Sequence, residues 1–128
     1  MITLNELSDK YYFLKGVCFE HMGGWADILD EFYSQLICLF KLAGSDYGFK
    51  IDQQKEKYGV LTIYYSFLDD NVPDELLKLV DALYESVYEK SKFVCECCGN
   101  AGEYEDMSGI TKVLCKKCVN KISRNEEA

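Results

Sequence analysis

Four cysteines in two closely spaced pairs constrain this 128-residue chain more than any other feature. Cys95 and Cys98 form one C-x2-C pair, and Cys115 and Cys118 form a second. Two thiolates three positions apart on a tight turn can each reach one ion at about 2.3 Å, and two such turns complete a tetrahedron. Gly99 follows the first pair, where the chain must bend sharply. The spacing therefore predicts one structural Zn²⁺ bound by these four cysteines.

Two other readings of the cysteines are less consistent with the sequence. A redox C-x2-C motif needs a neighbouring βαβ unit, which the pattern lacks, and a catalytic zinc keeps one position open, whereas four thiolates close the shell. Cys97 also lies in the first motif, but Cys98 gives the x2 spacing, so Cys97 is expected to be a spare thiol. Cys18 and Cys38 are expected to be small core residues on helix faces.

His21, the only histidine, precedes Gly23-Gly24 in a predicted loop. With four sulfur ligands available, it is expected to make contacts and not to bind the metal.

The net charge of −8 is unevenly distributed along the chain. Residues 1–90 hold 8 Lys/Arg and 16 Asp/Glu, whereas residues 91–128 hold 6 of each. Neither part has the basic surface on which nucleic-acid affinity mainly depends. The acidity indicates either simple solubility or an acidic face that meets a basic partner.

Lysines surround the second cysteine pair, and they have two possible roles. They either offset the negative thiolates or contact the phosphates of a nucleic acid. The balanced local charge favours the first role. These lysines are Lys112, Lys116, Lys117 and Lys121.

Hydrophobic periodicity predicts three helices and one hairpin. A capping box at Thr3 and Glu6 starts a first helix whose apolar positions continue to Cys18. A second helix is expected over 25–43, and a third from Pro73 to about residue 90. Alternation over 49–54 and 60–67 predicts two strands, with Gly59 in a left-handed turn.

The side chains expected to face the helices are those of the second strand, Leu61, Ile63, Tyr65 and Phe67. On the first strand, Phe49, Ile51 and Gln53 alternate with Lys50, Asp52 and Gln54.

The predicted fold class is α+β, with helices packed on a β-hairpin and a C-terminal zinc ribbon. We expect a helical and hairpin core over 1–90, a ribbon over 91–122 and a flexible tail over 123–128. The apolar runs are too short to cross a bilayer, and the N-terminus does not read as a signal peptide. A cytoplasmic location is therefore expected, where clustered cysteines are more often metal ligands than disulfides.

Three blocks of the sequence resemble a family of small proteins of bacteriophages, prophages and bacteria. The blocks are Gly24-Trp25, the hairpin segment from Gln54 to Tyr65, and the cysteine motif 95–99 with Gly102. The chain departs from that family at Ile110, where tryptophan is usual, and at Cys118, where histidine is common. The resemblance implies the fold and the zinc site, with no known activity.

No spacing of nucleophile, base or phosphate loop points to an enzyme. The sequence instead favours a small acidic zinc-containing binding protein, phage-related, that modulates or inhibits a host protein such as a defence complex. In that case its location would be the host cytoplasm. One alternative is a nucleic-acid-binding ribbon in transcription control, and another is an immunity protein to a toxin. No membrane partner is expected.

Overall fold

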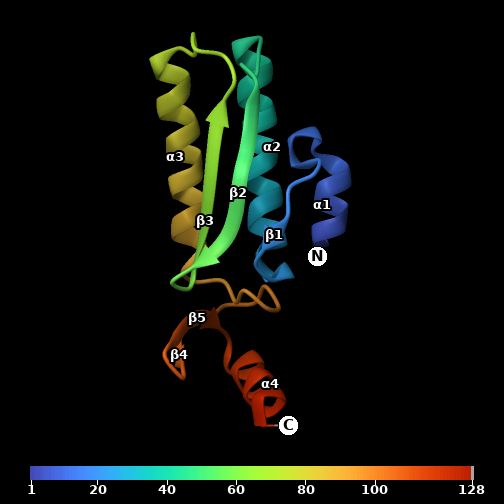
Figure 1. Ribbon diagram of the computed structural model, residues 1–128, viewed down its shortest axis with the longest axis vertical. Helices are drawn as coiled ribbons and strands as arrows, with labels where there is room; N and C mark the ends of the chain where they lie inside the picture. The colour runs from blue at the N-terminus through green and yellow to red at the C-terminus, as the bar shows by residue number, and fades with distance from the viewer. Residues whose placement is uncertain (128) are drawn as a thin grey trace.

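Two long helices and a long β-hairpin form the two layers of the larger part of the molecule (Figure 1). The computed structural model describes residues 1–127. Helix α2 (Ala26–Ala43) and helix α3 (Asp74–Ser91) lie behind the hairpin of β2 (Phe49–Lys57) and β3 (Val60–Phe67). A smaller unit of β4, β5 and α4 lies beyond the hairpin turn. The fold is α+β, as predicted, with the cysteine cluster in the smaller unit.

Helix α2 forms where the sequence predicted it, because its apolar residues recur on one face. A 3-10 turn, η2 (Gly23–Trp25), leads into it, and Gly44 ends it in the left-handed conformation at φ 80°. Tyr33 lies on the buried face of α2 and is fully buried. The buried residues of α2 are Ala26, Leu29, Phe32, Tyr33, Leu36 and Phe40.

Strand β2 is longer than predicted, strand β3 has the predicted bounds, and the two strands meet in a two-residue turn. Tyr58 and Gly59 have φ of 53° and 87°, so both adopt the left-handed backbone of a tight hairpin turn, including the predicted Gly59. The predicted loop residues 55–57 belong to β2. Leu61 and Ile63 are buried against the helices, and Tyr65 and Phe67 are partly buried.

A β-bulge changes which glutamine of β2 faces the core. The register shifts between Ile51 and Gln53, so that Gln54 is fully buried and Gln53 only partly so. An extra residue in one strand reverses the alternation beyond it. The regular alternation predicted for this strand is therefore interrupted after Ile51. The amide of Gln54 accepts a hydrogen bond from the Tyr33 hydroxyl.

The predicted two-stranded hairpin is part of a three-stranded sheet in the order β1-β2-β3. The short strand β1 (Phe19–Glu20) pairs with β2 in parallel. On the other edge, α3 side chains bind the backbone of β3: Leu61 N donates to Ser91 Oγ at 3.0 Å, and Ile63 N donates to Tyr84 Oη at 3.2 Å. Both edges of the hairpin are thus partly covered.

The first helix ends earlier than predicted. Its capping box is present, but α1 spans only Leu4–Lys10, and a 3-10 turn, η1 (Tyr12–Leu14), follows. Tyr11 leaves the helix in an extended conformation because its buried ring packs inside while its hydroxyl donates to Asp30 Oδ1 at 2.6 Å. Apolar residues three apart suit a 3-10 turn as well as an α-helix, which explains the error.

Cys18 and Cys38 are exposed, so the prediction that they are core residues is wrong. Cys18 follows the turn at Gly16, where φ is 80°, and lies outside any helix. Cys38 lies on α2 two residues from both Leu36 and Phe40, which places it on the face opposite the core.

The C-terminal unit combines a small hairpin with a helix. Strands β4 (Glu103–Met107) and β5 (Ile110–Leu114) pair antiparallel, and α4 spans Lys116–Glu127. A flexible tail was predicted from Ser123, whereas the structure continues the helix to Glu127; Ala128 lies outside the described residues. The ribbon and its cysteine cluster are present as predicted.

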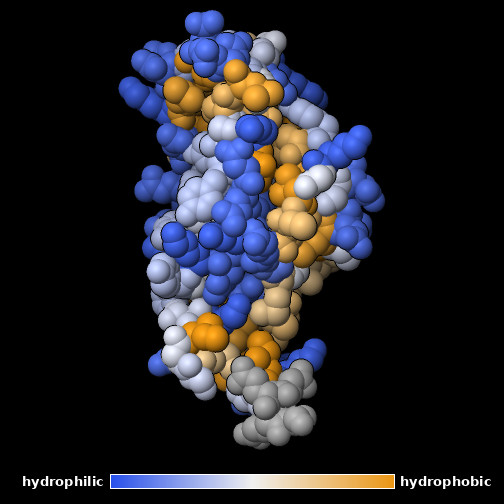
Figure 2. Space-filling model, viewed as in Figure 1, coloured by the Kyte–Doolittle hydropathy of each residue, from blue (hydrophilic) through white to orange (hydrophobic). Residues whose placement is uncertain are grey.

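The outer face of the β2–β3 hairpin is polar. Figure 2 shows hydrophilic side chains over the middle of this face, which is turned toward the viewer. Lys50, Asp52 and Tyr64 are exposed there. The hairpin therefore has the inward apolar and outward polar faces expected of a sheet that packs on one side only.

Candidate metal centre

The four predicted cysteines converge on one point. The sulfur atoms of Cys95, Cys98, Cys115 and Cys118 all lie within 4.8 Å of one another, and the Cys98 and Cys115 sulfurs are 3.6 Å apart. Sulfurs at about 2.3 Å from one ion in a tetrahedron are about 3.8 Å apart. The donor set and its spacing therefore fit a four-coordinate metal ion of a structural kind.

The first pair lies on a tight turn fixed by backbone hydrogen bonds. Gly99 N donates to Cys95 O at 2.9 Å, and Cys95 N donates to Asn100 O at 2.7 Å. Gly99 has φ 85°, a conformation that side chains disfavour. An isolated bridge between Val94 and Ala101 closes the turn. The backbone thus presents both sulfurs to the same side.

The second pair lies at the start of α4. Cys115 directly precedes the helix, and Cys118 lies in its first turn and is 6% exposed. The hydrogen bond from the Cys118 backbone N–H to the Cys115 sulfur lowers the pKa of Cys115 to about 7. Helix N-termini favour thiolates in this way, and a thiolate is the form that binds a metal. Burial raises the pKa of Cys118, so a bound cation is what would favour its thiolate.

The metal unit packs directly on the helical part through Gly24 and Trp25. Gly24 N donates to Glu96 O at 2.7 Å, and Trp25 Nε1 donates to Val94 O at 3.0 Å. A Cβ at position 24 would lie 2.5 Å from the Glu96 carbonyl carbon, so only glycine fits there. The sequence marked Gly24-Trp25 as a motif but gave no sign of this contact, since the partners are about seventy positions away.

Glu96, between the two cysteines of the first motif, is a residue that the sequence analysis missed. Its side chain is 1% exposed and accepts a hydrogen bond from Met22 N at 3.0 Å. Lys112 Nζ lies 3.3 Å from Glu96 and 3.6 Å from Glu56 of β2. A buried carboxylate needs such partners. This group joins three parts of the chain beside the metal centre.

Two of the four lysines near the second cysteine pair are engaged by carboxylates. Lys116 Nζ lies 3.3 Å from both Glu103 and Glu105 of β4, in addition to the Lys112 contacts. Their charges are therefore balanced by acidic side chains of the protein. The role predicted for them, to offset the negative thiolates, therefore stays a prediction.

Cys97 and His21 lie outside the group of four sulfurs. Cys97 is half-buried against the ribbon cluster, as expected for a spare thiol. His21 contacts Met22 O through Nδ1 at 2.8 Å and Gln54 Nε2 through Nε2 at 3.0 Å. Burial lowers the pKa of His21, which favours the neutral ring. His21 is thus a contact residue. It continues a series of hydrogen bonds that runs from Tyr33 through Gln54 toward the metal unit.

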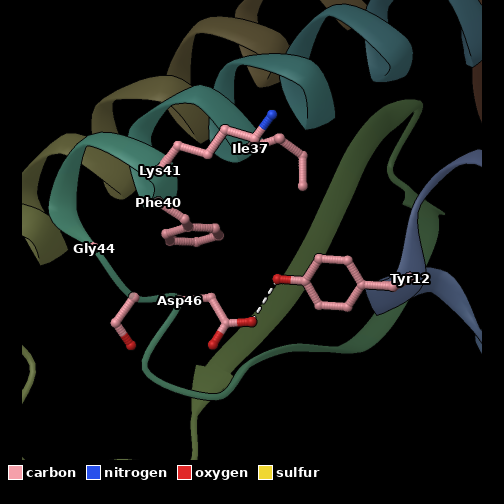
Figure 3. A pocket seen from close by; sticks show the side chains of 7 residues that line it. Tyr12, Ile37, Phe40, Lys41, Gly44 and Asp46 are labelled. Atoms are coloured by element: carbon pink, nitrogen blue, oxygen red, sulfur yellow. Dashed lines mark hydrogen bonds between the residues drawn. The ribbon is translucent and has the colours of Figure 1, made fainter.

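A separate hollow lies at the far end of α2 (Figure 3). It has a volume of about 350 Å³ and includes Ile37, Phe40 and Lys41 from the helix. Tyr12 donates a hydrogen bond to Asp46 across one side of it, as the figure shows. The carboxylate of Asp46 also accepts from Gly48 N at 2.9 Å, so its role there is to hold the loop after α2.

Comparisons of the chain with protein-family models, with curated proteins and with solved structures find no match. The resemblance to the phage and prophage family therefore stays a prediction. Within the described residues, no helix has the length and apolar character needed to span a membrane.

Proposed function

We propose that this chain is a small acidic binding protein in which a structural Zn²⁺ holds the C-terminal ribbon, and that it modulates a host protein by direct contact. The observation that carries the proposal is the division of the molecule into a closed four-cysteine centre and an acidic helical part. Four thiolates leave no open coordination position, so the ion would act on the fold and not on a substrate.

The choice of Zn²⁺ follows from the ligands. A tetrahedral set of four sulfurs suits Zn²⁺ or iron, and the x2 spacing with a following glycine is typical of zinc knuckles. We expect one Zn²⁺ per chain by elemental analysis of the purified protein. Cys98→Ser should lose the ion, whereas its neighbour Cys97→Ser should keep it. Retention of zinc by Cys98→Ser would contradict the assignment.

The binding function rests on the charge and on exposed apolar side chains. All of the net charge of −8 comes from residues 1–90, so a basic partner would be attracted to that part. Several large apolar residues are at least half exposed, which is a feature of contact surfaces when they gather in patches. They include Leu42, Leu68, Leu79 and Phe93.

The phage relation and the host partner follow from the family resemblance. Proteins of phages often act by binding a host factor, and a host defence complex is the example we favour. If the partner is a toxin, the protein would instead be an immunity protein that binds the toxin through the same acidic part.

A pull-down from bacterial lysate with the tagged zinc-loaded protein tests the proposal. We expect a protein partner in stoichiometric amount, whose binding weakens at high salt because the acidic part contributes. No stoichiometric partner would contradict the proposal.

A titration with DNA and RNA at low salt separates the nucleic-acid alternative. That alternative expects tight binding that falls steeply with salt. We expect none, because Lys112 and Lys116 already contact carboxylates. Tight salt-dependent binding would favour a ribbon protein of transcription control instead.

A further inference from the structure

An apolar groove lies between α2 and α3 on the side away from the hairpin. It has a volume of about 360 Å³, and its lining is almost entirely apolar where it meets solvent. Leu42 is 88% exposed and Leu79 is 51% exposed. The lining residues are Ser34, Gln35, Cys38, Leu39, Leu42, Leu79, Ala82 and Leu83.

This groove is unexpected on a two-layer fold. The inner faces of α2 and α3 pack on the sheet, and their outer faces should be polar. The outer face of the hairpin follows that rule, as Figure 2 shows. The helices do not, because Cys38 and Leu42 on α2 face outward beside Leu79 and Ala82 on α3. Exposed apolar side chains gathered along a groove mark a contact surface.

The groove has the shape that accepts a third helix. Helices α2 and α3 run in opposite directions side by side (Figure 1), and Lys90 Nζ joins Glu31 across one end at 2.8 Å. On α2, Gln35, Cys38 and Leu42 are spaced at i, i+3 and i+7, so they form one row along the groove. An amphipathic helix can set its own apolar row between two such helices.

The charges of α2 and α3 indicate which kind of partner helix the groove would bind. Over all their faces, helices α2 and α3 together carry eight Asp and Glu and three Lys, and three of these carboxylates, Asp30, Glu31 and Glu89, already contact lysines. Glu75 lies one turn before Leu79 in the same row, and Glu31, which already contacts Lys90, lies one turn before Gln35. A partner helix with Lys or Arg beside its apolar row would meet the carboxylate of Glu75. A second copy of this chain would instead bring two acidic surfaces together.

We propose that the groove between α2 and α3 binds a basic amphipathic helix of the partner protein. This inference rests on the proposed binding function and names the surface and the chemistry of the partner. The apolar row would supply most of the affinity, and the flanking cations would supply orientation and a faster encounter.

A displayed library of helical peptides tests the proposal directly. The probe is a set of peptides of about 18 residues, about 27 Å as a helix, with a fixed leucine row and with Lys, Glu, Gln or Ser allowed at each flanking position. After selection on the zinc-loaded protein, we expect lysine to be enriched at the flanks. Enrichment of glutamate, or no enrichment over an empty support, would overturn the proposal.

Variants locate the binding site of the selected peptides. Leu42→Glu and Leu79→Glu should each weaken binding at least tenfold in fluorescence anisotropy. Ile110→Glu is the matched control: Ile110 is 58% exposed in the ribbon hairpin, so the same change there should leave affinity unaltered. Circular dichroism and zinc content show that each variant is folded. Equal binding by all three variants would overturn the proposal.

Two further outcomes separate this inference from the wider function. If wild-type protein dimerises in sedimentation and Leu42→Glu abolishes the dimer, the groove is a self-contact and the proposal fails. If the partner captured from lysate binds Leu42→Glu and Leu79→Glu as well as wild type, the protein is a binding protein that uses another surface. In that case only the groove assignment is lost.

Discussion

The helical part and the ribbon differ in what fills their interiors. The helical part buries one continuous cluster of eighteen apolar or aromatic residues, and burial of this hydrophobic core drives its folding. Among the described residues, the ribbon cluster has three buried members, and two of them, Cys95 and Cys118, belong to the group of four cysteines that could hold a metal ion. A unit with so few buried apolar side chains is expected to depend on a bound ion for its folding free energy. One chain thus combines two ways of holding a fold.

The contact between the two parts is specific and polar. It uses the Gly24 and Trp25 hydrogen bonds to the first knuckle, together with the ion pairs of Lys112. At the turn between β2 and β3, a Cβ on Gly59 would lie 3.2 Å from Thr111 Cγ2, so this turn lies close to strand β5 of the ribbon. The difference between the regions can therefore be tested by disturbing the ion, the contact or the charges one at a time.

Removal of the metal should have the largest effect. We expect a chelator to unfold residues 92–122, since binding of a structural zinc is worth on the order of 10 kcal/mol of folding free energy. The helical part should keep its secondary structure because its apolar cluster lies outside the ribbon. Far-UV circular dichroism and backbone NMR measure both. Loss of all helical signal would contradict the comparison, and Cys118→Ser should reproduce the chelator result.

Gly24→Ala should separate the two parts without removing a ligand. Its new methyl group would collide with the backbone of residues 95 and 96, which the hydrogen bonds of the first cysteine turn hold in place. The free energy of unfolding should therefore fall by about 3 kcal/mol or more. Chemical denaturation of the zinc-loaded protein measures this.

Gly23→Ala is the matched control. The nearest atom to its new methyl would be Leu4 Cγ at 3.9 Å, and we expect a change within about 1 kcal/mol. Equal effects of the two substitutions would show that the contact at Gly24 is not close.

Glu96→Gln should have an intermediate effect. It removes a buried charge that accepts from Met22 N and faces Lys112, and bonds to charged groups are worth about 1.5–3 kcal/mol. Glu103→Gln breaks a contact of the same 3.3 Å length, but Glu103 is 67% exposed, so it should cost less than about 1 kcal/mol. Thermal unfolding of the two variants gives the comparison, and similar losses would argue against a special role for Glu96.

The smallest effect should come from the charge on His21. Because burial lowers its pKa below 6.5, the unfolded chain binds the proton more tightly than the folded one. Its contribution to stability is present above the unfolded pKa and is lost as the pH falls below about 6.5, by at most about 1.4 kcal/mol per pH unit. The free energy of unfolding of wild type and of His21→Gln is measured across this pH range, and the difference between the two isolates the contribution of His21 from protonation of the thiolates. If the two free energies change with pH in parallel, this account is contradicted.

The sequence predicted the local features of the fold correctly. The C-x2-C spacing brought Cys95, Cys98, Cys115 and Cys118 to one point, and the change of period from 3.6 to 2 marked the hairpin with Gly59 in its turn. These signals work because ligand geometry and side-chain periodicity act over a few residues.

The sequence failed where distant residues decide. Tyr11 breaks the first helix because Asp30 and the core hold it, and the bulge that turns Gln54 inward leaves no mark in a pattern of alternation. Glu96 looks like an ordinary spacer residue until Met22 and Lys112 enclose it. Helix α4 begins at the second cysteine pair, and its apolar face of Val119 and Ile122 is too short to be read as a helix.

The position of Trp25 has one practical consequence. It is the only tryptophan, it is fully buried, and its indole N–H donates a hydrogen bond to the carbonyl of Val94, the residue before Cys95. The fluorescence emission of Trp25 therefore reports on the contact between the helical part and the ribbon. A red shift would report that the ribbon has come away, so loading of the ion could be followed by light in a single cuvette without any attached dye.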